Sequence, residues 1–219
     1  MISVADLLRE TRLPANYFDY ASYLRGDLDL GLLENRRGDR LIAIPQTLVT
    51  ALYKGLGQET GQAARLVLMN CGIWWGKNFY TRFTESLEEY YGIPLAEMSM
   101  ATFTECLKEC WTTHGWGALE FDPEYQSRGL LLIRTKNSPY GIQIQGDRRP
   151  SCFLEAGILT SFFSRLSGQD LLAAQTTCES LGDPQNTFIL GLVKRLEICE
   201  ALLAEGLGHD AIIQRLLND

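Results

Sequence analysis

Hydrophobic residues between positions 46 and 91 recur at the spacing of helix turns, and Gly55-Leu56-Gly57 predicts an interruption within them. Gly92-Ile93-Pro94 ends this run, because glycine and proline both stop helices. A second helix is expected over residues 99–113, whose apolar side chains share one side. The aromatic-rich stretch 14–24 is expected to be a helix or an ordered loop. The first half of the chain is therefore predicted to be mainly helical.

Short segments with strand character lie between polar turns. Residues 28–33 and 41–44 predict a β-hairpin, and Pro45 ends its second strand or opens the next helix. Two later pairs of segments have the same character: 117–121 with 129–134, and 171–178 with 187–190. These pairs predict further antiparallel hairpins.

Three more helical segments are expected in the second half of the chain. Residues 152–166 are apolar and end at Ser167-Gly168. Beyond Gly191, the apolar spacing predicts an amphipathic helix to about residue 203, and a short final helix follows Gly206 to Asp210. Helices and hairpins together predict an α+β fold, in which helices pack on an antiparallel sheet.

Charge and hydropathy narrow the classes of function. The 219 residues carry a formal net charge of −7 and a pI near 5.0, so no nucleic-acid partner is expected. The longest apolar runs are too short for a transmembrane segment. The N-terminal residues have neither the basic nor the apolar region of a secretory signal. A cytoplasmic protein is expected.

Six cysteines are scattered along the chain, at positions 71, 106, 110, 152, 178 and 199. Without a secretory signal they are expected to be free thiols rather than a disulfide framework. Cys106 and Cys110 share one side of the predicted helix, and four-apart cysteines can bind a metal. Because no partner His or Cys is found near them in the sequence, a buried apolar pair is the preferred interpretation.

The segment from Cys152 to Leu190 carries the most specific pattern in the chain. A cysteine opens an apolar helix with an internal glycine, and Gln175-Thr176-Thr177-Cys178 and Gly182-Asp183 follow at fixed spacing. This segment resembles the signature of the V4R (4-vinyl reductase) domain family. Residues 52–61 are more weakly similar to an upstream Leu-Tyr and glycine helix of that family.

The resemblance implies an organisation into three parts. Residues 1–39 would form an N-terminal helix and hairpin arm, 40–190 the V4R-like domain, and 191–219 a C-terminal helical extension that caps the pocket or mediates self-association. The family shares its fold with TRAPP vesicle-tethering subunits and haem-NO sensors. Its members typically enclose a hydrophobic small molecule between sheet and helices, and many are dimeric, which implies a homodimer here.

The family also implies a possible metal site. In V4R sensors that bind zinc, the ligands are Cys, Glu, Cys and Cys, and their positions correspond here to Cys152, Gln175, Cys178 and Asn186. Zinc prefers anionic thiolate and carboxylate ligands, whereas Gln175 and Asn186 offer neutral amides. Zinc is therefore not expected. The amides are expected to bridge the same elements by hydrogen bonds instead.

The function that the resemblance implies is non-enzymatic. The protein would bind a hydrophobic small molecule, with a tetrapyrrole as the expected example, and assist the assembly or pigment supply of a photosynthetic complex, as a cytoplasmic protein or at the periphery of the photosynthetic membrane. One alternative is a structural scaffold with a filled core, and another is a vinyl reductase of chlorophyll precursors. No dinucleotide or phosphate-binding loop is present in the sequence, which argues against the reductase.

Two aromatic groups are the candidate ligand-binding residues. The first lies on the long predicted helix and the second around the following turn: Trp74, Trp75, Phe79, Tyr80 and Phe83, then Trp111, His114 and Trp116. Aromatic-lined concavities suit planar apolar ligands, although plain core packing explains the same pattern. His114 is the candidate axial ligand of a tetrapyrrole metal, with a capping or surface role as the alternative.

Overall fold

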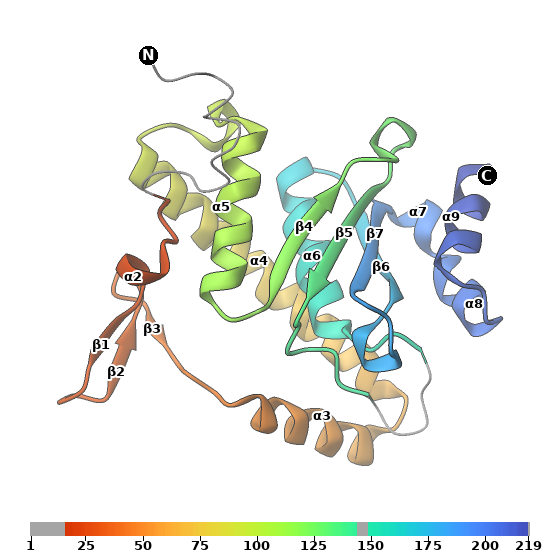
Figure 1. Cartoon of the computed structure of the whole chain (residues 1–219), viewed down its shortest axis with the longest axis horizontal. Helices are drawn as coiled ribbons and strands as arrows, with labels where there is room; N and C mark the ends of the chain where they lie inside the picture. Colours follow the sequence, from red (N-terminus) through yellow and green to blue (C-terminus); the bar gives the residue numbers. More distant parts are fainter. Residues whose placement is uncertain (1–15, 144–148, 219) are drawn as a thin grey trace. The chain divides into compact units, whose positions relative to one another are not determined.

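The computed structural model describes residues 16–143 and 149–218 (Figure 1). The chain divides into two compact units. Unit 1 combines Met1–Ala43 with Arg82–Trp116, and unit 2 combines Ile44–Thr81 with Gly117–Asp219. The predicted N-terminal helix falls partly on residues 1–15, outside the described chain. No helix in the described residues is both long and apolar enough to span a bilayer.

Unit 1 contains a small antiparallel sheet next to short and long helices. The elements are α2 (Tyr20–Tyr23), β1 (Arg25–Asp27), β2 (Leu32–Glu34), β3 (Arg40–Leu41), the 3₁₀ helix η1 (Leu95–Glu97) and α5 (Met100–Thr113). Helix α5 begins where the sequence predicts, because the Ser99 hydroxyl accepts a hydrogen bond from the Thr102 N–H.

The predicted hairpin of residues 28–33 and 41–44 is wrong in its strand limits. Strand β2 pairs with β1 as well as β3, in the order β1-β2-β3, and residues 28–31 form the turn between β1 and β2. The Asp27 carboxylate accepts hydrogen bonds from the N–H groups of Asp29 and Leu30, which holds this turn. The alternation of Asp and Leu is therefore a turn with exposed leucines, not a strand.

Helices α3 (Gln46–Thr60) and α4 (Ala63–Tyr91) form the long helical region, and α4 contributes to both units. The predicted interruption at Gly55-Leu56-Gly57 is wrong, because these residues lie within α3. The chain breaks at Gly61 instead, where φ is +58°, a conformation that glycine adopts without the steric cost of a Cβ.

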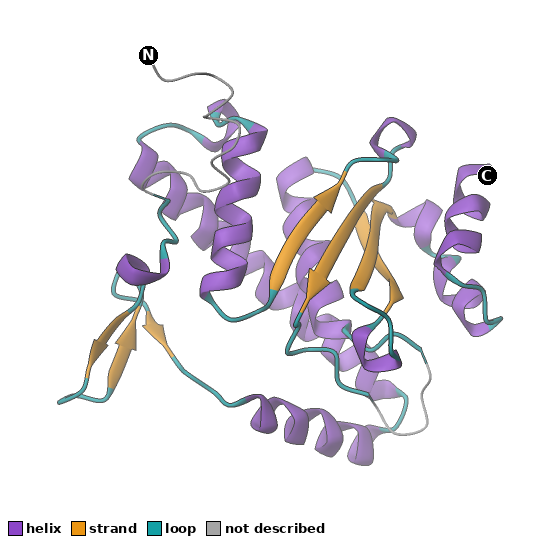
Figure 2. Ribbon diagram, viewed as in Figure 1, coloured by secondary structure: helices purple, strands orange, loops and turns teal. Residues whose placement is uncertain are grey.

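The core of unit 2 is a four-stranded antiparallel sheet, as predicted (Figure 2). Its strands are β4 (Ala118–Asp122), β5 (Leu131–Lys136), β6 (Leu171–Thr177) and β7 (Asn186–Leu192), in the order β4-β5-β7-β6. The 3₁₀ helices η2 (Gln126–Arg128) and η3 (Glu179–Leu181) lie in the connections. Ile133 pairs with Phe188 in the centre of the sheet, and Gln175 pairs with Phe188 from the other side.

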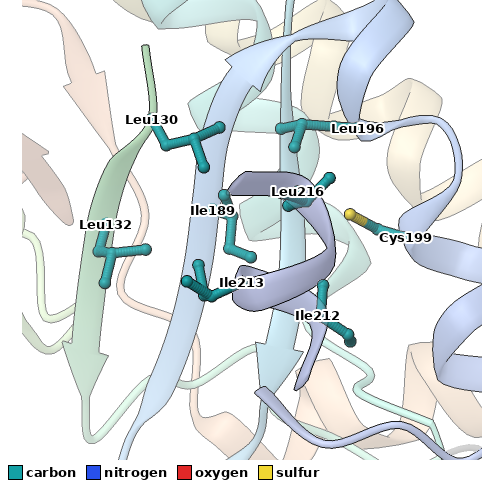
Figure 3. Close-up of a cluster of buried hydrophobic side chains, with 8 residues drawn as sticks. All are labelled: Leu130, Leu132, Ile189, Leu196, Cys199, Ile212, Ile213 and Leu216. Atoms are coloured by element: carbon teal, nitrogen blue, oxygen red, sulfur yellow. The ribbon is translucent and has the colours of Figure 1, made fainter. Parts of the chain in front are cut away.

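Helices cover both faces of this sheet. Helix α6 (Phe153–Ser167) packs against β6, and α7 (Val193–Leu196), α8 (Cys199–Ala204) and α9 (His209–Asn218) cover the opposite face. Figure 3 shows this second layer, in which Leu132 and Ile189 of the sheet meet Ile213 and Leu216 of α9. Strand β7 is consequently buried from Asn186 to Gly191.

The single amphipathic helix predicted beyond Gly191 is wrong. Strand β7 continues to Leu192, which pairs with Leu171 and so stays extended, and two short helices follow. The end of α9 is fixed by two arginines, since Arg195 donates to the Leu216 carbonyl and Arg128 donates to the Leu217 carbonyl. Residues 193–218 therefore pack on the sheet and form part of its hydrophobic core.

Helices α4 and α6 approach each other within unit 2 until their backbones touch. A Cβ atom at Gly157 would lie 2.3 Å from the Met69 carbonyl oxygen, and one at Gly72 would lie 2.1 Å from the Leu154 carbonyl oxygen. Gly76 faces Ser161 and Ile158 at similarly short distances. The internal glycine of the 152–190 signature thus permits this close helix packing.

Helix α6 also protects the outer edge of β6. The Ala173 N–H donates to the Thr160 hydroxyl at 2.9 Å, and the Leu171 N–H donates to the Ser164 hydroxyl at 3.1 Å. These N–H groups point away from β7, where an edge strand would otherwise offer them to another chain. Small hydroxyl residues on α6 therefore close this edge.

Candidate functional site

The four positions that correspond to the family's zinc ligands come together in unit 2. Cys152 precedes α6, Gln175 lies in β6, Cys178 follows β6, and Asn186 begins β7. The Sγ atoms of Cys152 and Cys178 are 3.8 Å apart, and the Cys152 Sγ lies 3.5 Å from the Asn186 Oδ1. All four side chains are buried. They form what we call the thiol–amide cluster.

A β-bulge makes this convergence possible. In a regular strand, residues three apart point to opposite faces, so Gln175 and Cys178 would be separated by the sheet. The register between β6 and β7 shifts between Gln175 and Thr177, so that Thr176 and Thr177 both lie opposite Thr187. The extra residue returns Cys178 to the face on which Gln175 lies.

The Gln175 amide has a single orientation that satisfies its neighbours. Its Oε1 accepts a hydrogen bond from the Cys152 N–H at 2.9 Å, and its Nε2 donates to the Thr177 carbonyl at 2.9 Å. A flipped amide would oppose donor to donor and acceptor to acceptor. The Nε2 consequently faces the Cys152 Sγ at 3.2 Å as a hydrogen-bond donor.

The Asn186 amide is held by groups that the sequence did not single out. Its Nδ2 donates to the Glu179 Oε2 at 2.8 Å and to the Thr135 hydroxyl at 3.3 Å, while its Oδ1 accepts from the Glu179 N–H at 3.0 Å. Glu179 also accepts from the Asn137 and Ser138 N–H groups. Its position directly after Cys178 was the only sequence signal for this role.

The two thiols differ in environment and therefore in pKa. The pKa of Cys178 is lowered, first by the hydrogen bond from the Cys152 thiol and then by the Ser180 hydroxyl at 3.1 Å and nearby backbone N–H groups. The pKa of Cys152 is raised, because its proton is held by Cys178 and because the thiol is buried. The pair therefore keeps one proton on Cys152 after Cys178 has lost its own.

The thiol–amide cluster does not fit a structural zinc ion. Two sulfur atoms and the Asn186 oxygen face one another, but Gln175 presents N–H where a fourth ligand is needed. A tetrahedral site requires four electron-pair donors. In the part of the chain that the structure describes, no group of three or more His, Cys, Asp or Glu side chains is placed to hold a metal.

The predicted aromatic residues are divided between the two units. In unit 2, Trp74 is 73% exposed, whereas Trp75 and Phe79 turn toward the protein and their rings lie 6.4 Å apart. The Phe79 ring meets Phe162 of α6 at 5.2 Å, and Phe163 extends the group to Phe121 of β4. Tyr80 also contacts Phe162. The unit 2 aromatic cluster consists of Trp75, Phe79, Tyr80, Phe121, Phe162 and Phe163.

In unit 1, Phe83 and Trp111 are buried, and Trp116 packs edge-on against Trp111. His114 ends α5 and stacks at a tilt on Trp116. Its Nδ1 lies 2.7 Å from the Cys110 carbonyl and its Nε2 lies 3.3 Å from the Tyr23 hydroxyl. The neutral ring therefore donates through Nδ1 and accepts through Nε2, so both nitrogens have partners.

Cys106 and Cys110 are buried on α5, as the sequence predicts. The expectation that no histidine lies near them is wrong. The His114 Nδ1 is 3.6 Å from the Cys110 Sγ, because one further helix turn places residue 114 beside residue 110. The Tyr91 hydroxyl lies 3.5 Å from the Cys106 Sγ.

Burial lowers the pKa of His114 below its ordinary value, and this predicts a pH dependence of stability. The unfolded chain binds a proton more readily than the folded chain, so acidification favours unfolding. We expect the free energy of unfolding to fall as the pH drops from about 7 to about 5. In urea unfolding measured at several pH values, His114→Gln should flatten this dependence. An unchanged slope would contradict the prediction.

The pKa of His209, which is hydrogen-bonded to Thr176, is also lowered, mainly by burial. His209→Gln is therefore the matched comparison, and each substitution alone should remove only part of the dependence. The two histidines lie in different units, so their effects should add.

The segment that contains this site is similar to a known domain family. Residues 133–192, which include β5, α6, β6, β7 and all four cluster positions, match the family model described as the V4R domain. This segment is similar to the V4R domain. A search of curated proteins finds no match to the chain.

Solved structures share the fold of this chain. The phenol-responsive sensory domain of the transcription activator PoxR, solved with phenol, is 21% identical and has a TM-score of 0.65, covering 88% of this chain and 98% of that one. Trafficking protein particle complex subunit 3 from Naegleria fowleri, covalently bound to palmitic acid, is 12% identical, with a TM-score of 0.51 over 67% and 94% of the two chains. The α+β fold with TRAPP-like relatives is thereby confirmed.

A third solved structure is a vinyl-4-reductase family protein from Methanocaldococcus jannaschii. It is 18% identical, with a TM-score of 0.43 over 68% of this chain and 82% of that one.

Proposed function

We propose that this protein binds a hydrophobic small molecule and does not itself catalyse a reaction. The observation that carries the proposal is the unit 2 aromatic cluster. Phe162 and Phe163 are buried, and the rings of Trp75, Phe79 and Phe121, which surround them, remain partly exposed. Partly exposed aromatic faces over a rigid apolar floor are suited to stack a planar ligand.

The fold relationships support the same class of ligand. The PoxR sensory domain, which shares the fold over nearly its full length, was solved with phenol. The tethering-complex subunit was solved with palmitic acid. An aromatic ligand fits the cluster better than an acyl chain, because six rings meet there. We therefore propose a planar aromatic compound.

Within this class, a tetrapyrrole carried for a photosynthetic complex is the most specific proposal. Its support is the family resemblance. Both nitrogens of His114 already have hydrogen-bond partners, so a tetrapyrrole should bind by stacking rather than by ligation of its metal to this histidine.

Isothermal titration calorimetry with phenol and with metal-free protoporphyrin tests the proposal. We expect saturable binding of at least one probe, weakened about fivefold in Phe79→Ala, since one aromatic contact contributes on the order of 1 kcal/mol. Asn78→Ala, at the exposed position next to Phe79, is the matched control and should bind as the unaltered chain does. Absence of binding by either probe, or equal affinity in Phe79→Ala, would count against the proposal.

A structural scaffold is the second candidate, and one observation favours it. The backbone contact between α4 and α6 at Gly72 and Gly157 leaves no space for a ligand between these two helices. A scaffold would bind neither probe and would still fold cooperatively. The same titration therefore separates the two functions.

We also propose that the protein forms a homodimer through the exposed faces of α3 and α4 in unit 2. Leu48 and Leu52 are four residues apart on α3 and are 45% and 62% exposed, and Leu66 and Trp74 of α4 are exposed as well. Apolar side chains repeated along a helix face are typical of an interface.

Multi-angle light scattering after gel filtration measures the oligomer directly. A dimer is expected for the unaltered chain and a monomer for Leu52→Glu, because a buried, unpaired carboxylate opposes association. Lys54 is also exposed on α3, but it lies two residues after Leu52 and therefore on a different side of the helix. Lys54→Glu is the control and should remain dimeric. A monomeric unaltered chain would refute the proposal.

A further inference from the structure

The thiol–amide cluster holds two thiols at close range without the ligands that zinc needs. We propose that Cys152 and Cys178 form a site of reversible oxidation, at which a small peroxide converts the two thiols into an intramolecular disulfide. This inference is independent of the proposed ligand-binding function. It concerns the two thiols of the cluster, whereas ligand binding is assigned to the unit 2 aromatic cluster.

The geometry of the pair favours a disulfide. The two Sγ atoms are 3.8 Å apart and in contact, and an S–S bond requires them to approach to about 2.05 Å. Both cysteines lie at the ends of elements, Cys152 before the first turn of α6 and Cys178 after the last residue of β6. Extended or irregular backbone at both positions can absorb this approach without disrupting a helix or a strand pair.

The surroundings of the pair isolate it from other thiols. Gln175 and Asn186 contact the Cys152 Sγ, and Ser180 and Ser151 contact the Cys178 Sγ. These neighbours cannot themselves be oxidised by a mild peroxide. A sulfenic acid formed on one cysteine would therefore meet the other cysteine before any further reaction partner.

The partly exposed neighbour of the pair lies beside Cys178. Ser180, whose hydroxyl lies 3.1 Å from the Cys178 Sγ, is itself partly exposed and also donates to the Gln143 side chain. The Cys152 Sγ is contacted instead by Gln175 and Asn186, whose side chains are both buried. We therefore assign first reaction with the oxidant to Cys178 and resolution to Cys152.

The reaction balances with hydrogen peroxide as the oxidant. The Cys178 sulfur, as thiolate, attacks one peroxide oxygen, the O–O bond breaks, and the departing hydroxide takes up a proton to leave as water. The Cys152 sulfur then attacks the resulting sulfenic acid, the S–O bond breaks, and a second water leaves with the Cys152 proton. Two thiols are oxidised by two electrons in total, and one peroxide is reduced to two waters.

Cys106 and Cys110 supply an internal comparison within the same chain. Both are buried, but they lie one turn apart on α5, where Cβ atoms are about 5–6 Å apart and a disulfide needs about 3.5–4.5 Å. If burial alone decided reactivity with peroxide, the two cysteine pairs would react equally. The proposal predicts that only Cys152 and Cys178 become linked.

The experiment uses the full chain with Cys71→Ser, because Cys71 is exposed and would form intermolecular disulfides. After treatment with hydrogen peroxide and alkylation of remaining thiols, mass spectrometry should show the loss of two hydrogen atoms. Peptide mapping without reductant should show residues 152 and 178 linked, and dithiothreitol should reverse the link. The linkage should form at least ten times faster than any oxidation of Cys106 or Cys110.

Two variants decide the assignment. In Cys152→Ser, Cys178 should accumulate as a sulfenic acid that dimedone traps. In Cys178→Ser, the remaining Cys152 thiol should not react with the peroxide. Circular dichroism of each variant checks the fold, and the linked peptide in the Cys71→Ser chain tests the proposal even where a variant unfolds. Oxygen addition without a linked peptide, or protection of the pair by stoichiometric zinc, would overturn the proposal.

Discussion

Gly157→Ala is expected to lower the free energy of unfolding by about 3 kcal/mol, at the upper end of typical overpacking costs. The new Cβ would lie 2.3 Å from the Met69 carbonyl oxygen and 2.8 Å from the Ile73 nitrogen. Both are backbone atoms of α4, so no side chain can rotate to make room, and the two helices must separate. Urea unfolding followed by circular dichroism measures this loss.

Gly55→Ala is the matched control for this substitution. Gly55 lies within α3, and a Cβ there would meet no atom within 4 Å. We expect a gain in stability of about 0.5–1 kcal/mol, because alanine loses less backbone entropy on helix formation. Equal destabilisation at positions 55 and 157 would show that helix propensity, and not the α4–α6 contact, governs both results.

Leu216→Ala is expected to cost about 3 kcal/mol through the cavity that it leaves in the core. Leu216 is fully buried, and it belongs to the cluster formed with Leu132 and Ile189 of the sheet (Figure 3). Shortening the chain to remove residues 209–218 should have a larger effect. It would expose one face of β5 and β7, so we expect loss of cooperative unfolding and aggregation.

Gln214→Ala provides the comparison on the solvent side of α9. Gln214 is exposed, and its replacement should change stability by less than about 0.5 kcal/mol. Thermal unfolding monitored by circular dichroism distinguishes the three chains. A shortened chain that unfolds as cooperatively as the full chain would contradict the core role assigned to α9.

The periodicity of the sequence predicted the sheet of unit 2 well. The strands near residues 118, 131, 171 and 186 each begin or end within a few residues of their predicted limits, because each is bounded by glycine or polar turns. Helix limits were less predictable. Gly55 and Gly61 are the same residue type in similar surroundings, and only the conformation of the chain at Gly61 shows which one ends α3.

The candidate site was predictable in position but not in orientation. Family spacing identified Cys152, Gln175, Cys178 and Asn186, and the structure brings them together. It did not show that the Gln175 nitrogen faces sulfur, because that depends on the Thr177 carbonyl. Trp74 illustrates a second limit, since adjacent tryptophans on a helix point in different directions and only Trp75 turns inward.

The bulge at Thr176 sets a rule for transferring this site to other proteins. A designer who copied the four side chains onto a regular antiparallel hairpin would keep the spacing Gln-x-x-Cys and still lose the site, because Cys178 would emerge on the far side of the sheet. The Thr176 hydroxyl bonds to the Thr187 carbonyl and to His209, and not to the sulfur atoms of the cluster. The extra residue is nevertheless as necessary to the graft as the cysteines, because it sets the direction of Cys178.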